Sequence, residues 1–361
     1  MISSLSGGGA ENICVSLANS FAKNGWNVDL VILNLYNEAY LNRLSDNVNL
    51  VVLNVDHARY SFIPLLKYIY NNKIKIALVF NYELTVILVI MRFLFKFKMK
   101  IISRNINTFS IKIKEFRQKN IWTNYLVRPL IKHFYHKTDH VVNQCEAMRD
   151  DLISEFPKLQ HNSSTIYNPL PMHISDYAKN YDFKKIKKEN YLLCVGRLEK
   201  QKAFHFAIEA FAGIAKKFPD LRLKIVGKGS LEQDLKQKVI DNCIENRVDF
   251  EGFQKNIIPY YLQARGTVLT SLYEGYPNVL IESIAMNTPV VAFDCSSGPN
   301  EIIKDGLNGY LVKYQNVDDL KKKLSSLLLN HFDYRDLRIS IQKNQIDNIF
   351  KKYEYLINSI T

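Results

Sequence analysis

Short apolar runs alternate with helical patterns along almost the whole chain, and this alternation restricts the possible folds more than any other feature of the sequence. In the amino-terminal half a glycine loop opens a helical pattern at 10–24, and apolar runs follow at 28–33, 50–53, 76–80, 100–103 and 140–143. A second series extends from Tyr191 to about Val312. Short apolar strands that alternate with helices indicate parallel sheets, so the sequence predicts an α/β protein.

The length of the chain and its turn residues predict two domains. A chain of 361 residues can bury two separate cores. Proline-containing turn chemistry at 164–171 closes the first half, and the polar stretch that follows is typical of a linker. We therefore expect a first domain at 1–172, a linker at 173–190, a second domain at 191–340 and a helical tail at 341–361.

Composition argues against several classes of site. The five cysteines are scattered without a C-x-x-C pair, and the eight histidines show no H-E-x-x-H spacing. This usage predicts reduced core thiols in a cytoplasmic protein, with neither a disulfide framework nor a metal site. No signal-peptide pattern follows Met1. The formal charge of +13 requires an anionic partner, but the sequence has no helix-turn-helix, zinc-finger or RNP pattern, which argues against nucleic acid.

One segment combines apolar and basic residues. The stretch 84–97 is intensely apolar but too short to span a bilayer as a helix. The basic residues around its end and just after it are Lys96, Lys98, Lys100, Arg104, Lys112, Lys114 and Arg117. Apolar surface beside a basic cluster suits attachment to an anionic membrane surface. The alternative is a helix buried against a parallel sheet and followed by a solvated basic loop.

Two glutamates, Glu274 and Glu282, bracket a Gly-Tyr-Pro-Asn turn that leads into an apolar helical pattern. Such a turn leaves the first backbone N–H groups of the helix without intrahelical partners, and these groups can hold a phosphate or a sugar hydroxyl. Glu274 can accept hydrogen bonds from hydroxyls, and Glu282, about two turns further on, can bind a vicinal diol such as a ribose. The alternative is an ordinary helix with an N-terminal acid and a solvated glutamate.

Two further strand–loop–helix units place basic residues and glycines after apolar strands. The first has Arg197 and Lys202 behind a strand that ends at Gly196, and the second has Gly227 and Gly229. Open α/β sheets bind ligands at the carboxyl ends of their strands. An arginine fork and a lysine point charge suit a diphosphate, and glycines let the backbone approach a ligand closely. For each loop alone, the alternative is a solvated surface turn.

These motifs, with the Gly-Arg-Leu-x-x-x-Lys block at 196–202 and Ser-Gly-Gly-Gly-Ala-Glu at 6–11, resemble the large family 4 of retaining glycosyltransferases. The resemblance covers nearly the whole chain and is specific in the carboxyl half. It implies the GT-B fold, with two Rossmann-like domains facing each other across a cleft and a last helix that returns to the first domain. Family members have a complete strand before the glycine loop. Only six residues precede Gly7, so we expect that strand to be truncated or to begin upstream of Met1.

The resemblance also implies roles for individual residues. Arg197 and Lys202 would stabilise the negative charge that accumulates on the nucleoside diphosphate, Glu274 would orient the transferred sugar, and Glu282 would hold the ribose. The base would lie near the backbone of the Gly-Phe pair after the strand at about 250. The donor-binding residues implied are Gly8, Gly9, Gly196, Gly227, Gly252, Phe253, Gly275, Tyr276, Pro277, Asn278, Val279 and Glu282. The chain has no Asp-x-Asp motif, which favours a site without metal or other cofactor.

One departure from the family concerns the acceptor side. Many relatives have a histidine after the strand equivalent to 101–103, whereas here Arg104, Asn105 or Asn107 stands in that place. Asparagine can bond a sugar hydroxyl but cannot transfer a proton near neutral pH. In retaining transfer the leaving phosphate can itself serve as the base, so activity is still expected.

Taken together, the resemblance predicts transfer of a hexose or N-acetylhexosamine from a UDP-sugar to a lipid-linked or polysaccharide acceptor. The expected setting is bacterial O-antigen or capsule synthesis, with the enzyme peripheral on the inner face of the cytoplasmic membrane. One alternative is a sugar-nucleotide epimerase, which would need catalytic carboxylates and histidines that we do not identify. Another is a non-catalytic nucleotide-sugar-binding protein, which the missing histidine and short first strand would suit. The intact Arg197, Lys202, Glu274 and Glu282 favour the transferase.

Overall fold

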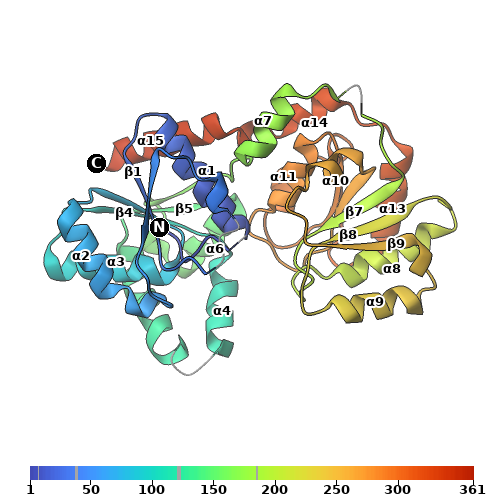
Figure 1. Ribbon diagram of the computed structural model, residues 1–361. Helices are drawn as coiled ribbons and strands as arrows, with labels where there is room; N and C mark the ends of the chain where they lie inside the picture. Colours follow the sequence, from blue (N-terminus) through green and yellow to red (C-terminus); the bar gives the residue numbers. More distant parts are fainter. Residues whose placement is uncertain (7, 37–39, 120–122, 184–185) are drawn as a thin grey trace. The chain divides into compact units, whose positions relative to one another are not determined.

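The computed structural model describes residues 1–6, 8–36, 40–119, 123–183 and 186–361, without the side chains of residues 115–119 and 123 (Figure 1). The described chain forms two compact units, and each has its own parallel sheet and helices. Unit 1 comprises Met1–Pro171 and Ile346–Thr361, and unit 2 comprises Met172–Gln345.

The strands and helices alternate in both units, as the apolar runs predict. Unit 1 contains α1 (Gly9–Lys23), β1 (Val28–Ile32), β2 (Val48–Val52), α2 (Phe62–Asn72), β3 (Ile76–Val79), α3 (Tyr82–Phe95), β4 (Lys100–Arg104), α4 (Phe109–Lys119), α5 (Arg128–Phe134), β5 (His140–Asn143), α6 (Glu146–Glu155), β6 (Ser163–Thr165) and α15 (Ile346–Ile360). Unit 2 contains α7 (Met172–Asn180), β7 (Tyr191–Val195), α8 (Phe204–Ala215), β8 (Arg222–Val226), α9 (Glu232–Asp241), β9 (Val248–Gly252), α10 (Ile258–Gln263), β10 (Gly266–Leu269), α11 (Asn278–Ala285), β11 (Val290–Phe293), α12 (Pro299–Ile302), β12 (Gly309–Val312), α13 (Val317–Leu329) and α14 (Tyr334–Ser340).

The sheet of unit 1 contains two ladders joined by the amino-terminal segment. Strands β3, β4, β5 and β6 pair in that order, and β1 pairs with β2, all in parallel. Ile2 forms a parallel bridge with Ile32 of β1, and the backbone N–H of Phe80 donates to the carbonyl of Met1 at 3.0 Å. Residues 1–3 therefore lie between β1 and β3, where the sequence predicts a shortened first strand.

Helix α15 belongs to unit 1, although unit 2 separates it in sequence from the rest of that unit. It packs on α1, and Phe21 of α1 meets Phe350 and Tyr353 edge to face at centroid distances of 5.2 and 6.2 Å. Ile349 and Ile357 of α15 are buried in the same core. Of the predicted tail 341–361, the part from Ile346 onward is thus an integral part of the core of unit 1.

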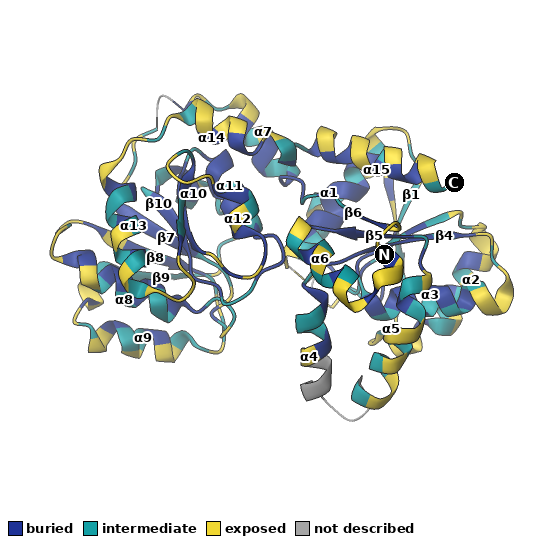
Figure 2. Ribbon diagram, turned by 180° about the vertical axis from the view of Figure 1, so that it is seen from behind, coloured by how far each residue is buried: buried dark blue, intermediate teal, exposed yellow. Residues whose placement is uncertain are grey.

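Unit 2 has a six-stranded parallel sheet in the order β12-β11-β10-β7-β8-β9. Helices α8, α9 and α13 cover one face and share a single apolar core with the sheet, while α10 and α11 lie on the other face. The central strands β7, β10 and β11 are buried along nearly their whole length (Figure 2). Because all six strands are parallel, the loops that follow them emerge at one edge of the sheet.

The described residues of 173–190, a stretch that we expected to be a linker, form part of unit 2. Helix α7 forms the first part of this stretch, up to Asn180, and packs against α11. Ile174 and Ala178 of α7 are buried. The polar composition of this segment predicts a loop, but its buried apolar residues are spaced as in a helix and hold α7 against unit 2.

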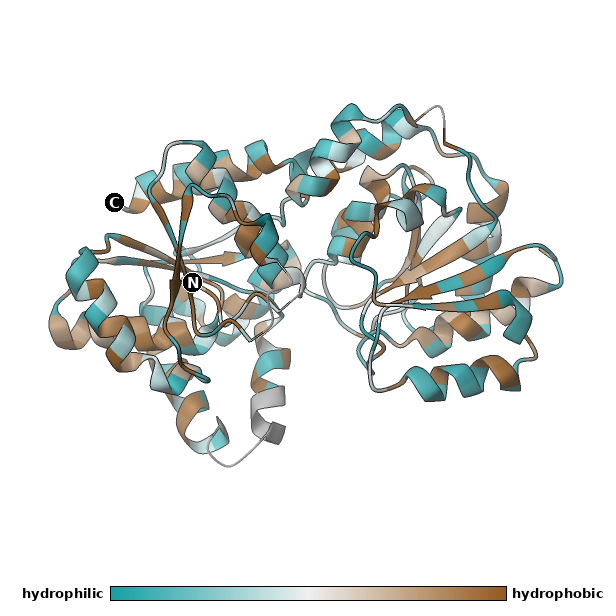
Figure 3. Ribbon diagram, in the orientation of Figure 1, coloured by the Kyte–Doolittle hydropathy of each residue, from teal (hydrophilic) through white to brown (hydrophobic). Residues whose placement is uncertain are grey.

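Helix α3 is apolar along most of its length (Figure 3) and follows the expected stretch 84–97 closely. Leu84, Leu88 and Met91 are fully buried against β3 and β4 in the core of unit 1. Among the described residues, no helix is long and apolar enough to cross a membrane.

Candidate functional site

The predicted donor-site residues of unit 2 gather at the carboxyl edge of its sheet. Gly196 follows β7, Gly227 follows β8, and Gly252 ends β9. Glu274 lies in the connection from β10 to α11. Because β10, β7, β8 and β9 are neighbours in this order, residues that are far apart in sequence converge there.

The centre of this edge is an ion pair between Lys202 and Glu274. The Lys202 Nζ lies 2.6 Å from Glu274 Oε1, and the Ser271 hydroxyl donates to the same oxygen at 2.6 Å. Only 15% of the Lys202 side chain and 9% of the Glu274 side chain are exposed. A cation and an anion that are largely withdrawn from water interact strongly, so the two charged groups hold each other in place.

The backbone around Glu274 is fixed from the loop after β11. The Ser297 hydroxyl donates to the Glu274 carbonyl oxygen. Gly298 has φ +92°, and a Cβ there would lie 2.6 Å from the carbonyl oxygen of Gly275. This close approach requires glycine and packs the β11 loop directly on the turn that precedes α11.

The predicted turn residues before α11 differ in their surroundings. Gly275, Tyr276 and Pro277 are buried, and the Tyr276 hydroxyl accepts a hydrogen bond from the Asn344 side-chain amide at 3.0 Å. The Tyr276 ring is therefore directed into unit 2. Asn278 and Val279 form the first turn of α11 and are partly exposed, and this turn begins four residues after Glu274.

Glu282 is anchored on the partly exposed side of α11. The Tyr261 hydroxyl, from α10, donates to Glu282 Oε2 at 3.1 Å. Burial and the neighbouring Glu282 carboxylate raise the pKa of Tyr261 well above its usual value, so the phenol stays protonated and remains a donor. One carboxylate oxygen is thereby fixed by Tyr261.

Arg197 is exposed and precedes Lys202 by five residues in the sequence. Its loop packs tightly on the neighbouring loop, which follows β8. Gly227 has φ +145°, and a Cβ there would lie 1.8 Å from the Gly196 carbonyl oxygen. The backbone N–H of Leu198 donates to the Lys228 carbonyl at 3.0 Å. The two loops are thus one rigid ledge that bears two exposed cations, Arg197 and Lys228.

The end of β9 presents the residues predicted to lie near a base. Gly252 has φ +66° and its carbonyl accepts from the Gly227 N–H at 2.8 Å. Phe253 is one of the exposed large apolar side chains, with 58% of its surface accessible. The Tyr260 hydroxyl donates to the Glu251 carboxylate at 3.1 Å. An exposed aromatic ring at this edge is suited to stacking on a planar base.

The predicted site residues of unit 1 differ from one another in how far they are exposed. Gly8 and Gly9 are exposed at the start of α1, whereas Gly7 lies outside the described residues. Asn105 is buried, and its amide is used at both ends, because Nδ2 donates to Asn143 Oδ1 at 2.7 Å and Oδ1 accepts from the Tyr135 hydroxyl at 2.6 Å. Asn107 is partly exposed.

Arg104 differs from the expectation for an acceptor-side residue. It is 1% exposed, and its guanidinium donates to Asn168 Oδ1 at 2.6 Å, to the Ile166 carbonyl at 3.3 Å and to the Tyr353 hydroxyl. The side chain therefore points into the core and links β4 to α15. We assign Arg104 a structural role, because its two terminal guanidinium nitrogens donate to buried partners in unit 1.

Sequence reasoning missed the residues that hold Glu274. Ser271 and Ser297 come from different loops, and Ser271 alone has a sequence signal, since it begins the motif three residues before the glutamate. Sequence reasoning also missed Lys228, although, like Arg197, it directly follows a glycine at the end of a strand. Among the described residues, no group of three or more His, Cys, Asp or Glu is placed to hold a metal ion.

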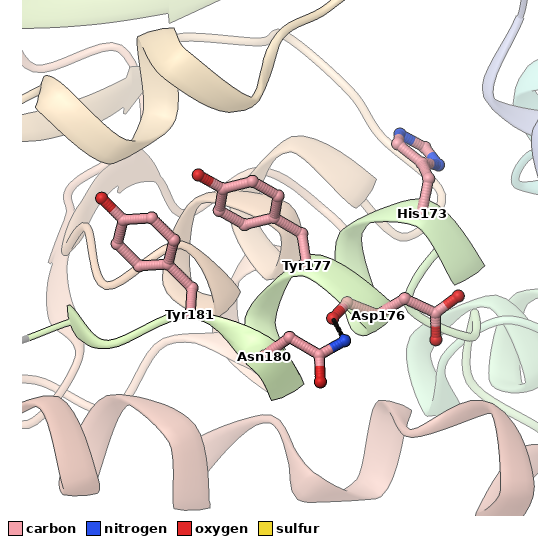
Figure 4. A pocket seen from close by; sticks show the side chains of 5 residues that line it. All are labelled: His173, Asp176, Tyr177, Asn180 and Tyr181. Carbon is pink, nitrogen blue, oxygen red and sulfur yellow. Dashed lines mark hydrogen bonds between the residues drawn. The ribbon is translucent and has the colours of Figure 1, made fainter.

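A separate shallow pocket of about 360 Å³ lies on α7 (Figure 4). Tyr177 and Tyr181 project to the same side of the helix and stack on each other with ring centroids 5.0 Å apart. The pocket is also lined by His173, Asp176 and Asn180. None of the residues predicted for the donor site lines it.

Two protein families match this chain. The family described as "Glycosyltransferase Family 4" matches residues 7–172, and the family described as "Glycosyl transferases group 1" matches residues 178–346. The two matches together follow the division into units closely.

Individual proteins are similar over long stretches. An uncharacterized glycosyltransferase of Haemophilus influenzae is 30% identical over 328 residues, which cover 90% of this chain and 88% of the relative. A Campylobacter jejuni relative, N-acetylgalactosamine-N,N'-diacetylbacillosaminyl-diphospho-undecaprenol 4-alpha-N-acetylgalactosaminyltransferase, is 29% identical over 210 residues, covering 58% of this chain and 56% of the relative. The crystal structure of Anabaena HepE in complex with UDP superposes with a TM-score of 0.75 at 18% identity and covers 99% of each chain.

Proposed function

Because this chain belongs to glycosyltransferase family 4 and has the GT-B fold of two Rossmann-like halves, we propose that it transfers a sugar from a nucleotide-sugar donor with retention of anomeric configuration. The donor is a UDP-linked hexose or N-acetylhexosamine. The acceptor is a lipid-linked or polysaccharide glycan of bacterial surface-glycan synthesis. The observation that carries this proposal is the Lys202–Glu274 pair at the carboxyl edge of the unit 2 sheet, with Arg197 exposed on the adjoining ledge.

The pair explains how the site is kept ready for a dianionic donor. Without donor, Glu274 neutralises Lys202 at 2.6 Å. A diphosphate brings more negative charge than one carboxylate, so Lys202 exchanges Glu274 for a phosphate oxygen when the donor binds. The freed carboxylate oxygen of Glu274 then accepts a hydrogen bond from a hydroxyl of the transferred sugar. Binding thus converts one ion pair into two donor contacts.

The chemical step breaks the bond between the anomeric carbon and the phosphate oxygen, and the electron pair stays on the diphosphate. Arg197 and Lys202 stabilise this charge, and each contributes more in the transition state than in the ground state because the charge is then growing. The acceptor oxygen bonds to the same face of the sugar and passes its proton to the leaving phosphate oxygen. No metal ion is required for this scheme, because two cationic side chains supply the positive charge.

The position of the other predicted residues at this edge supports the remaining proposed donor contacts. Glu282, positioned by Tyr261, holds the ribose diol, and Phe253 with Gly252 contacts the base. The UDP bound to Anabaena HepE supports uracil as the base. Gly8 and Gly9 remain predicted donor contacts, and Asn105 and Asn107 remain predicted acceptor-side contacts.

The acceptor class is proposed from a relative. The Campylobacter jejuni relative is named for a diphospho-undecaprenol substrate, which is a lipid carrier. A lipid-linked acceptor lies in a membrane, so we place the enzyme on the inner face of the cytoplasmic membrane as a peripheral protein.

Calorimetric titration with UDP, GDP and ADP in the presence of EDTA tests the donor site. We expect UDP alone to bind tightly, and the Arg197→Ala/Lys202→Ala variant to lose about 1.5–3 kcal/mol per cation, or roughly tenfold to hundredfold each. Lys236→Ala/Lys321→Ala is the matched control, because it removes two paired lysines of unit 2 that lie on α9 and α13. Flat titrations with all three nucleotides would refute the proposal.

A second variant separates binding from chemistry. Glu274→Ala removes the partner of Lys202, so UDP should bind at least as tightly as to the wild type, while transfer to acceptor is lost. If UDP binding is lost instead, Glu274 holds the nucleotide and not the sugar.

A further inference from the structure

The carboxyl end of α3 exposes a run of large apolar side chains. Phe93, Leu94 and Phe95 are 77%, 58% and 47% exposed, although the preceding turns of the same helix are buried. On the neighbouring helix α2, Ile63 is 76% exposed, and the ring of Phe62 contacts Phe95 at a centroid distance of 6.5 Å. Large exposed apolar side chains on two helices that are linked by an aromatic contact mark an interaction site.

Basic side chains lie next to these apolar residues. Lys96 ends α3 in the left-handed conformation, and both Lys96 and Lys98 are exposed. Arg92 of α3 donates to the Lys137 carbonyl at 2.6 Å, and Lys137 Nζ lies 3.4 Å from His133 Nε2. These contacts place the basic side chains of α5 next to the carboxyl end of α3.

Helix α5 adds a basic concavity to the same region. Among the described residues, a pocket of about 430 Å³ is lined by Arg128, Pro129, Lys132 and His133, and the charged or titratable groups of these residues are basic. Asp139, the acid that lies closest to Arg92 in this region, is paired with it. The pocket therefore has the charge and the size for an anionic head group.

We propose that this α3–α5 surface, formed by Ile63, Phe93, Leu94, Phe95, Lys96, Lys98, Arg128, Lys132, His133 and Lys137, docks unit 1 on an anionic lipid bilayer. The apolar side chains enter the boundary between head groups and acyl chains, and the basic side chains and the α5 pocket bind lipid phosphates. The inference deepens the proposed function, on which it rests, because it specifies how unit 1 meets a membrane-borne acceptor.

Charge selects a bilayer over a second copy of this chain. The chain carries a formal charge of +13, and the surface itself is basic. Two copies joined through it would bring like charges together, which is unfavourable, whereas an anionic leaflet attracts each lysine near it by about 1 kcal/mol. A surface that combines exposed apolar and basic side chains matches the two layers of a membrane interface.

Vesicle flotation tests the proposal with purified full-length protein. We expect binding to phosphatidylcholine vesicles that contain phosphatidylglycerol, little binding to phosphatidylcholine alone, and weaker binding as salt is raised. Phe93→Ser/Leu94→Ser should lower the partition coefficient by about tenfold or more, because two exposed apolar side chains no longer enter the bilayer. Lys98→Glu/Lys132→Glu should lower it by about tenfold or more, because two attractive charges become repulsive.

Leu329→Ser/Ile339→Ser is the matched control, because these residues are 66% and 65% exposed in unit 2 and lie outside the α3–α5 surface. It should bind vesicles like the wild type. Equal binding to both vesicle types, no binding, or wild-type binding by either α3–α5 variant would overturn the proposal. A dimer in sedimentation experiments that Phe93→Ser/Leu94→Ser dissociates would assign the surface to a second copy instead.

UDP titration of each variant separates this proposal from the proposed function. If vesicle binding fails while UDP binding is intact, only the docking proposal is refuted. If the wild-type protein binds vesicles but not UDP, only the proposed donor site is refuted.

Discussion

The Lys202–Glu274 pair gives the sharpest quantitative prediction. Lys202→Met removes one member and leaves the Glu274 carboxylate with the Ser271 hydroxyl as its hydrogen-bond donor. We expect unit 2 to lose stability, because a charge that is 9% exposed is then left without its counter-charge.

The burial of the two side chains sets the size of the expected loss of stability. Removing one partner of a fully buried pair costs about 3–5 kcal/mol, whereas an exposed pair contributes about 0–1 kcal/mol. Because Lys202 remains 15% exposed and Ser271 still donates to Glu274, we expect a loss of about 2–3 kcal/mol. The double variant Lys202→Met/Glu274→Gln carries no uncompensated charge. Its loss should therefore fall short of the sum of the two single losses by about 1–2 kcal/mol.

Hydrogen exchange measured by mass spectrometry reports unit 2 separately from unit 1. Amides in β7 and β10 lie in the centre of the unit 2 sheet, so their slowest exchange gives the free energy of unfolding of that unit. Lys236→Met is the control. Lys236 Nζ also lies 2.7 Å from a carboxylate, that of Glu232, but the two side chains are 43% and 33% exposed, so we expect a change below about 0.5 kcal/mol.

Two results would refute the reasoning about this pair. One is a Lys202→Met protein whose β7 and β10 amides exchange as slowly as those of the control. The other is a double variant whose loss equals the sum of the single losses, since the two side chains would then contribute independently.

Two further predictions concern the ledge and a buried histidine. Gly227→Ala should destabilise unit 2 by more than about 3 kcal/mol and weaken UDP binding in calorimetry, because its Cβ would meet the Gly196 carbonyl at 1.8 Å. Gly306→Ala, with φ +78° but open space around it, should cost only about 1 kcal/mol, and equal losses would contradict this account. Burial lowers the pKa of His140 to about 4, below its unfolded value of 6.5, so the folded state binds fewer protons between these values and stability falls as the pH is lowered through that window. Urea unfolding followed by circular dichroism between pH 4.5 and 7 should show this slope, about 1.4 kcal/mol per pH unit at most, and His140→Gln should flatten it; an unchanged slope would contradict it.

The sequence predicts the strands well because their apolar runs are short and are separated by helical patterns. The strand expected before Gly196 is β7, and the five runs of the amino-terminal half correspond to β1 to β5 within a few residues. The carboxyl-edge location of Lys202 and Glu274 also follows from these strands, since residues after parallel strands share one edge. Their direct pairing does not follow, because it depends on β7 being the neighbour of β10.

The role of Arg104 shows what local sequence cannot supply. Its position after an apolar strand is the same signal that identifies Arg197, so both are expected to face a ligand. The partner that turns Arg104 inward is Tyr353, which lies 249 residues away on α15. Similarly, the polar composition of 173–190 predicts a linker, and only the contact between α7 and α11 shows that its beginning is ordered.

The discontinuity of unit 1 also has a consequence for biosynthesis. The ribosome makes Met1–Pro171 first and α15 only after all of unit 2, so the nascent first segment lacks Ile349, Phe350 and Tyr353 from its core. Unit 2 is continuous in sequence and can complete its own core while α15 is still being translated. Until then, the apolar surface of α1 that later receives α15 stays uncovered, so we expect chaperones to bind the growing chain. A nonsense mutation even near residue 345 would remove α15 and thereby damage unit 1.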